Sequence, residues 1–270
     1  MTTLKVAVVT ALLAVVGGCQ PQEDAELTPS EARNLVLNLG SDVTLTLVLV
    51  PAGTFTMGSA GTEEGFFRGQ GPQRQVTLTK PFYMGIFEVT QEQYEAVIGT
   101  NPSQVAGPTN PVENLSKEDA IAFCGKLGEK TGLQVRLPTE AEWEYACRAG
   151  SQARFSFGDD ESSLGEYAWY SDNSGGRPHP VGQKKPNGFG LYDMHGNIFE
   201  WCSDWYTEDY YQRGENINPQ GPEFARYRPS VLRGGSYCDS PQLCRSAWRA
   251  TLAHSLRDGN IGFRVVACPE

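Results

Sequence analysis

Two carboxylates bracket a short glycine-bearing loop in the segment Asp193-Met194-His195-Gly196-Asn197-Ile198-Phe199-Glu200. Oxygen atoms at positions 193, 196, 198 and 200 can converge on one hard cation, with side chains from Asp193 and Glu200 and backbone carbonyls from Gly196 and Ile198. The spacing therefore predicts a calcium site, for which we favour a structural over a catalytic role. The alternative is that Asp193 and Glu200 act as caps or salt-bridge partners within a tight turn.

The thiols are the second group of residues that can do chemistry. The chain has seven cysteines, and an even number remain once Cys19 is set aside: Cys124, Cys147, Cys202, Cys238, Cys244 and Cys268. In an oxidising compartment an even number permits all of them to pair in disulfides. None are spaced as Cys-x-x-Cys, so a structural zinc site is not predicted.

The histidines and arginines carry no catalytic pattern. His179, His195 and His254 do not form an H-x3-H-x-E cluster, so a histidine iron site is not predicted, and His195 is expected to be structural. A cluster of basic residues late in the chain is expected to form internal ion pairs with the many Asp and Glu. Its members are Arg233, Arg245, Arg249 and Arg264.

Charge and composition exclude several classes of protein. The formal net charge is -10, which repels phosphate backbones, so nucleic acid is not an expected partner. No glycine-rich stretch has the strand-to-helix phosphate pattern, so a nucleotide is not expected either. Hydrophobic residues make up 39% of the chain, enough for a packed core. The 30 glycines and 17 prolines interrupt regular elements and argue against a helical bundle.

The first residues are typical of an export signal. Residues 1–18 have a short positive region at Lys5 and an apolar run over Val6–Val16. The following Gly17-Gly18-Cys19 resembles the lipobox of bacterial lipoproteins, which implies cleavage before Cys19 and lipidation of its thiol. An ordinary signal peptide cleaved nearby is the alternative. Acyl chains on Cys19 would anchor the protein to a membrane. Gln20 follows the cysteine instead of Asp, which favours the outer membrane or cell surface over inner-membrane retention.

Behind the lipidation site, the polar and acidic stretch Gln20–Glu26 predicts a tether. The sequence thus divides into a lipoprotein signal peptide at 1–18, a lipidated tether at 19–41 and one globular domain at 42–270. The exported chain would sit in the cell envelope.

Few helices and several short strands are predicted to position these residues. Capping patterns predict helices that begin at Thr90, Ser116 and Thr139, the first ending at Gly99 and the third by Gly150. From Gly150 to Arg233 the chain is mostly Gly, Pro, Asn, Asp and aromatic residues, which is typical of functional loops or bound ions. Branched and alternating residues predict strands at Val43–Val50, Gln75–Thr79, Val231–Arg233 and Phe263–Val266.

Seven segments, in order, resemble the formylglycine-generating enzyme (sulfatase-modifying factor) domain, over roughly Val43 to Val266. They are Phe55-Thr56-Met57-Gly58-Ser59, Glu88-Val89-Thr90-Gln91, Arg136-Leu137-Pro138-Thr139-Glu140-Ala141-Glu142-Trp143-Glu144-Tyr145-Ala146, Asn187-Gly188-Phe189-Gly190-Leu191-Tyr192-Asp193-Met194-His195-Gly196-Asn197, Glu200-Trp201, Arg233-Gly234-Gly235-Ser236 and Gly262-Phe263-Arg264. The resemblance implies an α+β, C-type-lectin-like fold, rich in irregular loops with few helices and bound calcium.

The resemblance also implies where ions bind. One calcium site of the family would use Asp193, Gly196, Ile198 and Glu200 of this chain. The other would fall near Trp169 and the loop 171–180, which offers no matching Asn and Asp, so that site is not expected.

The catalytic part of the resemblance is altered. Formylglycine-generating enzymes hold copper(I) between two cysteine thiolates, activate dioxygen and oxidise a cysteine of a client protein to an aldehyde. This family places four residues between the two cysteines, whereas five separate Cys238 from Cys244. The likeness further implies disulfides Cys147–Cys244 and Cys124–Cys268, after which Cys202 and Cys238 remain to pair. That disulfide set leaves no copper site, and we favour it over a Cys238/Cys244 copper pair.

Three functional hypotheses follow. The chain is a copper- and dioxygen-dependent oxidase of a client protein, a non-catalytic lectin-like module that binds protein or glycan at the cell envelope, or a divergent enzyme that matures a secreted metabolite. The altered cysteine spacing and the export signal both weigh against the oxidase.

Overall fold

The computed structural model describes residues 34–227 and 229–268. The predicted signal peptide, the lipidation site Cys19 and most of the tether lie outside these residues. Within the described residues no helix has the length and apolar character needed to cross a membrane.

The three helices predicted from capping patterns are present. They are α1 (Gln91–Ile98), α2 (Lys117–Thr131) and α3 (Glu140–Arg148). The side chains of Thr90, Ser116 and Thr139 each accept a hydrogen bond from the backbone N–H three residues on. These bonds satisfy donors that a helix N-terminus otherwise leaves free, which explains why the sequence located the helices well. Shorter helices follow at α4 (Leu164–Tyr167) and α5 (Tyr210–Arg213), with 3-10 turns at Arg68–Gln70, Glu161–Ser163 and Pro241–Cys244.

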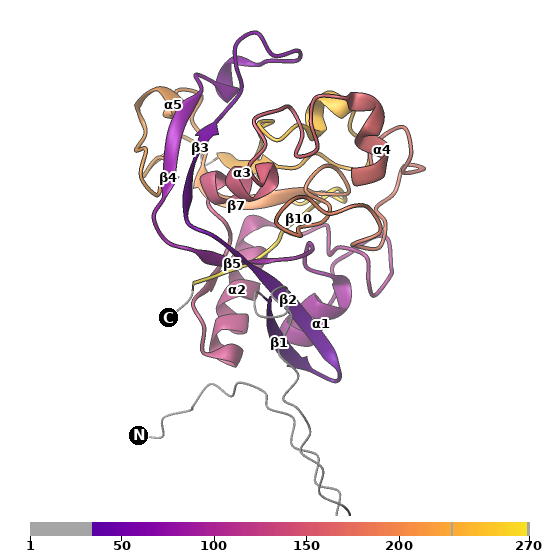
Figure 1. Ribbon diagram of the computed structural model, residues 1–270. Coiled ribbons are helices and arrows are strands. Elements are labelled where there is room, and N and C mark those ends of the chain that lie inside the picture. The colour runs from indigo at the N-terminus through magenta and orange to yellow at the C-terminus, as the bar shows by residue number, and fades with distance from the viewer. Residues whose placement is uncertain (1–33, 228, 269–270) are drawn as a thin grey trace, which may run out of the picture. The chain divides into compact units, whose positions relative to one another are not determined.

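The strands form three small sheets. A five-stranded sheet has the order β1 (Asn34–Gly40), β2 (Val43–Val50), β5 (Phe82–Gly85), β11 (Val266–Ala267), β6 (Val135–Arg136). A four-stranded sheet has the order β10 (Ile261–Gly262), β7 (Phe199–Trp205), β8 (Pro229–Arg233), β9 (Ala250–Ala253). The hairpin of β3 (Gly53–Met57) and β4 (Arg74–Leu78) lies with α5 at one end of the domain, whereas α1, α2 and the β1–β2 hairpin lie at the other (Figure 1).

The sequence predicted that the globular domain starts at residue 42. In the structure the domain already includes strand β1, which precedes that residue. It pairs antiparallel with β2 along its length. Leu37 and Leu39 are buried in the core, so the alternating leucines of Asn34–Gly40 mark a half-buried strand and not a tether.

The last predicted strand, Phe263–Val266, is two short strands instead. Strand β10 pairs with β7 of the four-stranded sheet, and β11 pairs with β5 and β6 of the five-stranded sheet. The chain crosses between the sheets at Phe263–Val265, all of which are buried. The apolar residues of Phe263–Val266 therefore indicated correctly that the segment is buried. They did not show that it forms one continuous strand.

Buried ion pairs join α3 to the second half of the chain. Glu144 of α3 pairs with Arg148, with Nε 2.9 Å from Oε1, and with Arg233 of β8. Glu140 forms two hydrogen bonds with Arg249, at 2.5 and 2.8 Å. Burial by itself would raise the pKa of Glu144, but Arg148 and Arg233 outweigh it and hold that pKa below its ordinary value. The arginine cluster thus forms the internal ion pairs that the sequence predicted.

Replacing Glu144 by alanine is expected to lower the free energy of unfolding by about 3–5 kcal/mol, because it leaves two buried guanidinium groups without their partner. Urea denaturation measures the change. Glu129→Ala, at an exposed position of α2, is the control and should stay within about 0.5 kcal/mol of the wild type. Equal stability of the two variants would show that the ion pairs do not hold α3 in place.

Candidate functional site

The predicted calcium loop is buried against β7 and β8. The Oδ2 atom of Asp193 accepts a 2.7 Å hydrogen bond from the backbone N–H of Gly182. Its Oδ1 atom is buried and has no hydrogen-bond partner among the described residues. The backbone N–H of Gly196 donates to the carbonyl of Gly234 at 2.8 Å, and Ile198 is fully buried.

Glu200 has a different role from Asp193. Its two oxygens accept hydrogen bonds from Nε and Nη2 of Arg264, both at 2.7 Å, and the indole N–H of Trp143 donates to Oε2 at 2.8 Å. Glu200 is therefore a salt-bridge partner here, the alternative that the sequence left open. Arg264 also donates to the carbonyls of Gly85 and Tyr192, so one guanidinium group ties the loop to the five-stranded sheet.

A third carboxylate, Glu88, completes this group. It accepts hydrogen bonds from the side-chain amide of Asn197 at 2.7 Å and from the backbone N–H of Ile198 at 3.2 Å. Burial, together with the charges of Asp193 and Glu200, raises the pKa of Glu88 well above its ordinary value. Sequence reasoning did not assign a role to Glu88, although it belongs to one of the segments that resemble the family.

The electrostatics of the loop favour a cation, but the predicted ligand set fits only in part. Burial is the main cause that raises the pKa of Asp193, to about 6. Its unpartnered Oδ1 suits a hard cation. Glu200, in contrast, offers no oxygen that is not already bound by Arg264 or Trp143. Across 34–227 and 229–268, no three His, Cys, Asp or Glu side chains are grouped so as to hold a metal ion.

Near Trp169 a lysine lies where the family would place a second ion. The Lys184 ammonium lies 3.8 Å from the centre of the Trp169 ring and donates a 2.6 Å hydrogen bond to the carbonyl of Gly165. His179 stacks on the same ring, with centroids 3.8 Å apart. The amine therefore supplies a positive charge in this region, and Asp193 raises the pKa of Lys184 against the dominant effect of burial.

The two candidate catalytic cysteines lie in unlike surroundings. Cys238 is exposed, with Ser236 Oγ at 3.2 Å and Asn260 Nδ2 at 3.5 Å from its sulfur. Cys244 is fully buried in an apolar cluster with Phe155, Leu164 and Ala168. Burial raises the pKa of the Cys244 thiol, and the nearby charges of Asp239 and Cys238 raise it further. Cys238 therefore lies in a polar, solvent-exposed setting, whereas burial holds Cys244 as a thiol.

All six described cysteines are free thiols in the structure. The Cys147 sulfur lies 3.9 Å from Nε2 of His195, whose Nδ1 contacts the carbonyl of Cys244 at 2.8 Å, so both cysteines lie beside His195. Cys124 and Cys268 both lie near Arg136. Cys202 is buried in a core cluster and shares no recorded contact with Cys238. The three disulfide pairings remain predictions.

His195 has the structural role that the sequence predicted. Its Nε2 lies 2.9 Å from the hydroxyl of Ser156 and accepts the backbone N–H of the same residue at 3.1 Å. Burial lowers the pKa of His195 to about 4, so the ring is neutral near pH 7. An acceptor at Nε2 places the proton on Nδ1, which then donates to the carbonyl of Cys244.

Comparisons with known proteins agree with this architecture. The family described as "Sulfatase-modifying factor enzyme 1-like domain" matches residues 41–268. The formylglycine-generating enzyme of Streptomyces coelicolor is 38% identical over 180 residues, covering 60% of this chain and 54% of that protein, so the chain spans about half the length of this relative. Chaperone protein LppX of Paenibacillus barcinonensis is 31% identical, covering 82% of this chain and 88% of that protein. The solved structure of Treponema denticola variable protein 1 superposes with a TM-score of 0.81 at 31% identity, covering 87% of this chain and 99% of that one.

Few helices, small sheets and long irregular loops define an α+β domain of the C-type-lectin-like, sulfatase-modifying factor type. The chain belongs to the sulfatase-modifying factor family, as its sequence indicated.

Substituting Asp193 by asparagine is expected to change how stability depends on pH. The folded-state pKa of Asp193 is raised, so the folded wild type keeps a proton that the unfolded chain releases, and the wild type loses stability as pH rises from about 4 to about 6. Asp193→Asn should remove this loss, so its melting temperature relative to the wild type should rise between pH 4 and pH 7. Thermal unfolding of demetallated protein measures the effect.

The control for that experiment is Asp172→Asn, at an exposed position on a neighbouring loop, which should follow the wild type at both pH values. Repeating the pH 7 melts with calcium tests the ion. Calcium should stabilise the wild type and not Asp193→Asn, because ligand binding to the folded state raises stability. If calcium changes neither melting temperature, no calcium site exists at Asp193.

Proposed function

We propose that this chain is a non-catalytic binding module of the sulfatase-modifying factor family, tethered to the cell envelope. The observation that carries the proposal is the burial of Cys244. Copper(I) is bound by thiolates, and a thiol that is sealed in an apolar cluster with a raised pKa is a poor ligand at neutral pH. Only Cys238 of the predicted pair faces solvent.

The names of similar proteins support a role other than oxidation. The same domain occurs in a formylglycine-generating enzyme and in a protein named a chaperone, and an equally similar structure is named only as a variable protein. The fold therefore serves more than one task, and function has to be argued from the site.

The second candidate is the copper- and dioxygen-dependent oxidase of a client-protein cysteine. It is favoured by one observation, that Cys238 and Cys244 lie on the same short connection between β8 and β9. In that case the two sulfurs would hold copper, which would supply the dioxygen chemistry. The side-chain amide of Asn260 would then donate to the sulfur of Cys238.

Thiol labelling of the native protein separates the two candidates. For a binding module, an alkylating reagent should modify Cys238 rapidly and Cys244 only after unfolding, and copper(I) with a cysteine-bearing peptide and dioxygen should give no aldehyde. Cys238→Ser is the matched control and should remove the rapid labelling. Labelling of both cysteines in the folded protein would overturn the argument from the burial of Cys244, and peptide oxidation would establish the oxidase. A non-reducing disulfide map of the mature protein would show whether Cys244 is bound to Cys147.

The envelope anchor is the second part of the proposal, with diacylglycerol on Cys19 and outer-membrane or cell-surface placement. Cys19→Ser is expected to move the protein from the detergent phase to the aqueous phase in a detergent partition assay, because each buried methylene contributes about 0.8 kcal/mol to membrane binding. Cys238→Ser serves as the control and should stay in the detergent phase. A wild-type protein that partitions into the aqueous phase, with no lipid mass on its N-terminal peptide, would exclude the anchor.

A further inference from the structure

A cavity of about 620 Å³, with both polar and apolar lining, lies apart from Cys238, Cys244 and the calcium loop. Its wall is built by the turn from β4 to β5, by β6, by α3, by the loop around Asn218 and by the end of β11. The volume falls within the range of small-molecule sites, which is about 300–1,000 Å³. Lining residues that carry polar groups are Thr79, Lys80, Gln134, Arg136, Glu142 and Asn218, with Gln220 and Cys268 beside them.

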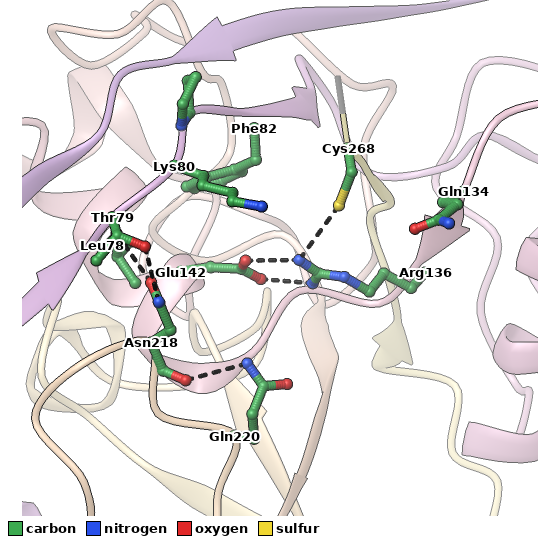
Figure 2. A pocket seen from close by; sticks show the side chains of 11 residues that line it. Leu78, Thr79, Lys80, Phe82, Gln134, Arg136, Glu142, Asn218, Gln220 and Cys268 are labelled. Carbon is green, nitrogen blue, oxygen red and sulfur yellow. Dashed lines mark hydrogen bonds and ion pairs between the residues drawn. The ribbon is translucent and has the colours of Figure 1, made fainter. Parts of the chain in front are cut away.

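An ion pair between Arg136 and Glu142 lines the cavity (Figure 2). The two Nη atoms of Arg136 bind the two oxygens of Glu142 at 2.6 and 2.7 Å. Glu142 also accepts a hydrogen bond from the backbone N–H of Thr139, the residue that caps the N-terminus of α3. The Nη atoms of Arg136 also donate to the carbonyl of Leu137 and to the sulfur of Cys268, so its terminal N–H groups are committed within the protein. The side chain remains 38% exposed, so its positive charge still faces the cavity.

Lys80 gives the cavity a net positive charge. Figure 2 shows its side chain extending into the space in front of the Arg136–Glu142 pair. Lys80 is exposed and forms no ion pair within the described residues. Lys80 and Arg136 give the cavity two positive charges, against one negative charge on Glu142. The formal net charge of the whole chain is -10, so this local excess of positive charge is opposite in sign. A local positive charge on an acidic protein favours a ligand that carries one negative charge.

Carboxamide groups supply the remaining polar contacts. Asn218 is fixed by hydrogen bonds with the backbone N–H and the hydroxyl of Thr79, both 2.8 Å, and accepts the side-chain amide of Gln220 at 3.1 Å. These bonds hold the wall in place and leave Oε1 of Gln220 free. The Gln134 side chain is exposed and has no recorded hydrogen bond among the described residues. Carboxamides both donate and accept, as the hydroxyl groups of a sugar do.

We propose that this cavity binds a single acidic sugar residue, such as a terminal uronic acid. Lys80 holds the carboxylate beside the positive charge of Arg136, and Gln134 and Gln220 hold the hydroxyl groups. Pro81 and the edges of Leu78 and Phe82 give a small apolar wall, which suits the C–H face of a sugar ring. The assignment rests on the proposed binding function and names its ligand class.

Other ligand classes match the cavity less well. A polyanion such as nucleic acid would bring many charges to a protein that repels them, whereas one carboxylate neutralises the single excess charge of the cavity.

Titration of the full chain with D-glucuronate, D-glucose and acetate, followed by isothermal calorimetry, tests the assignment. Glucuronate should bind at least tenfold more tightly than glucose, which lacks the carboxylate, and than acetate, which lacks the hydroxyl groups. Lys80→Gln should weaken glucuronate binding about tenfold. Lys126→Gln, which removes the same charge from an exposed position on α2, should leave it unchanged.

A second variant separates the two kinds of contact. The double substitution Gln134→Ala and Gln220→Ala should weaken glucuronate binding and leave acetate binding as in the wild type. Glucuronate that binds no more tightly than acetate or glucose, or that is weakened equally by Lys80→Gln and Lys126→Gln, would overturn the assignment. The binding function itself would survive if a glycan array shows other ligands that Lys80→Gln does not affect. The peptide oxidation assay decides separately whether the chain is an enzyme.

Discussion

The fold depends on guanidinium groups buried against carboxylates of α3 and β7. Arg233 and Arg249 bind Glu144 and Glu140 of one helix, while Arg264 binds Glu200 of the four-stranded sheet. A chain with few helices and small sheets has long loops whose backbone carbonyls need donors in the interior. Each guanidinium group provides several donors in a fixed geometry, so one side chain satisfies a carboxylate and backbone carbonyls together.

This constraint also limits what the calcium loop can bind. Arg264 neutralises Glu200 and occupies both of its oxygens, and the Lys184 ammonium lies near Asp193. Asp193 Oδ1 is left as the one carboxylate oxygen of the predicted ligand set with no partner. The positive charges of Arg264 and Lys184 therefore compete with a bound ion for the carboxylates of this loop. One or two side chains decide the outcome, even where the loop sequence is typical of the family.

The same reasoning separates the positions that matter for function. The cysteines that sequence comparison offers as a copper pair are divided by burial, because Cys244 belongs to an apolar cluster and Cys238 to the surface. The cavity with Lys80 and Arg136 draws its residues from segments far apart in sequence, and no spacing pattern could have brought them together.

The sequence by itself determined the family, the three long helices and the calcium-like loop, since capping residues and short motifs act locally and are visible along the chain. It also indicated that the arginines would pair internally. Only the tertiary structure decided that β1 belongs to the domain, that Glu200 pairs with Arg264 and that Glu88 joins the same group. The two carboxylate outcomes depend on desolvation and on contacts between residues more than sixty positions apart, as for Glu200 with Arg264 and Glu88 with Asn197. Burial, which sets the charge of a carboxyl or thiol group, is a property of the packed chain and not of its local sequence.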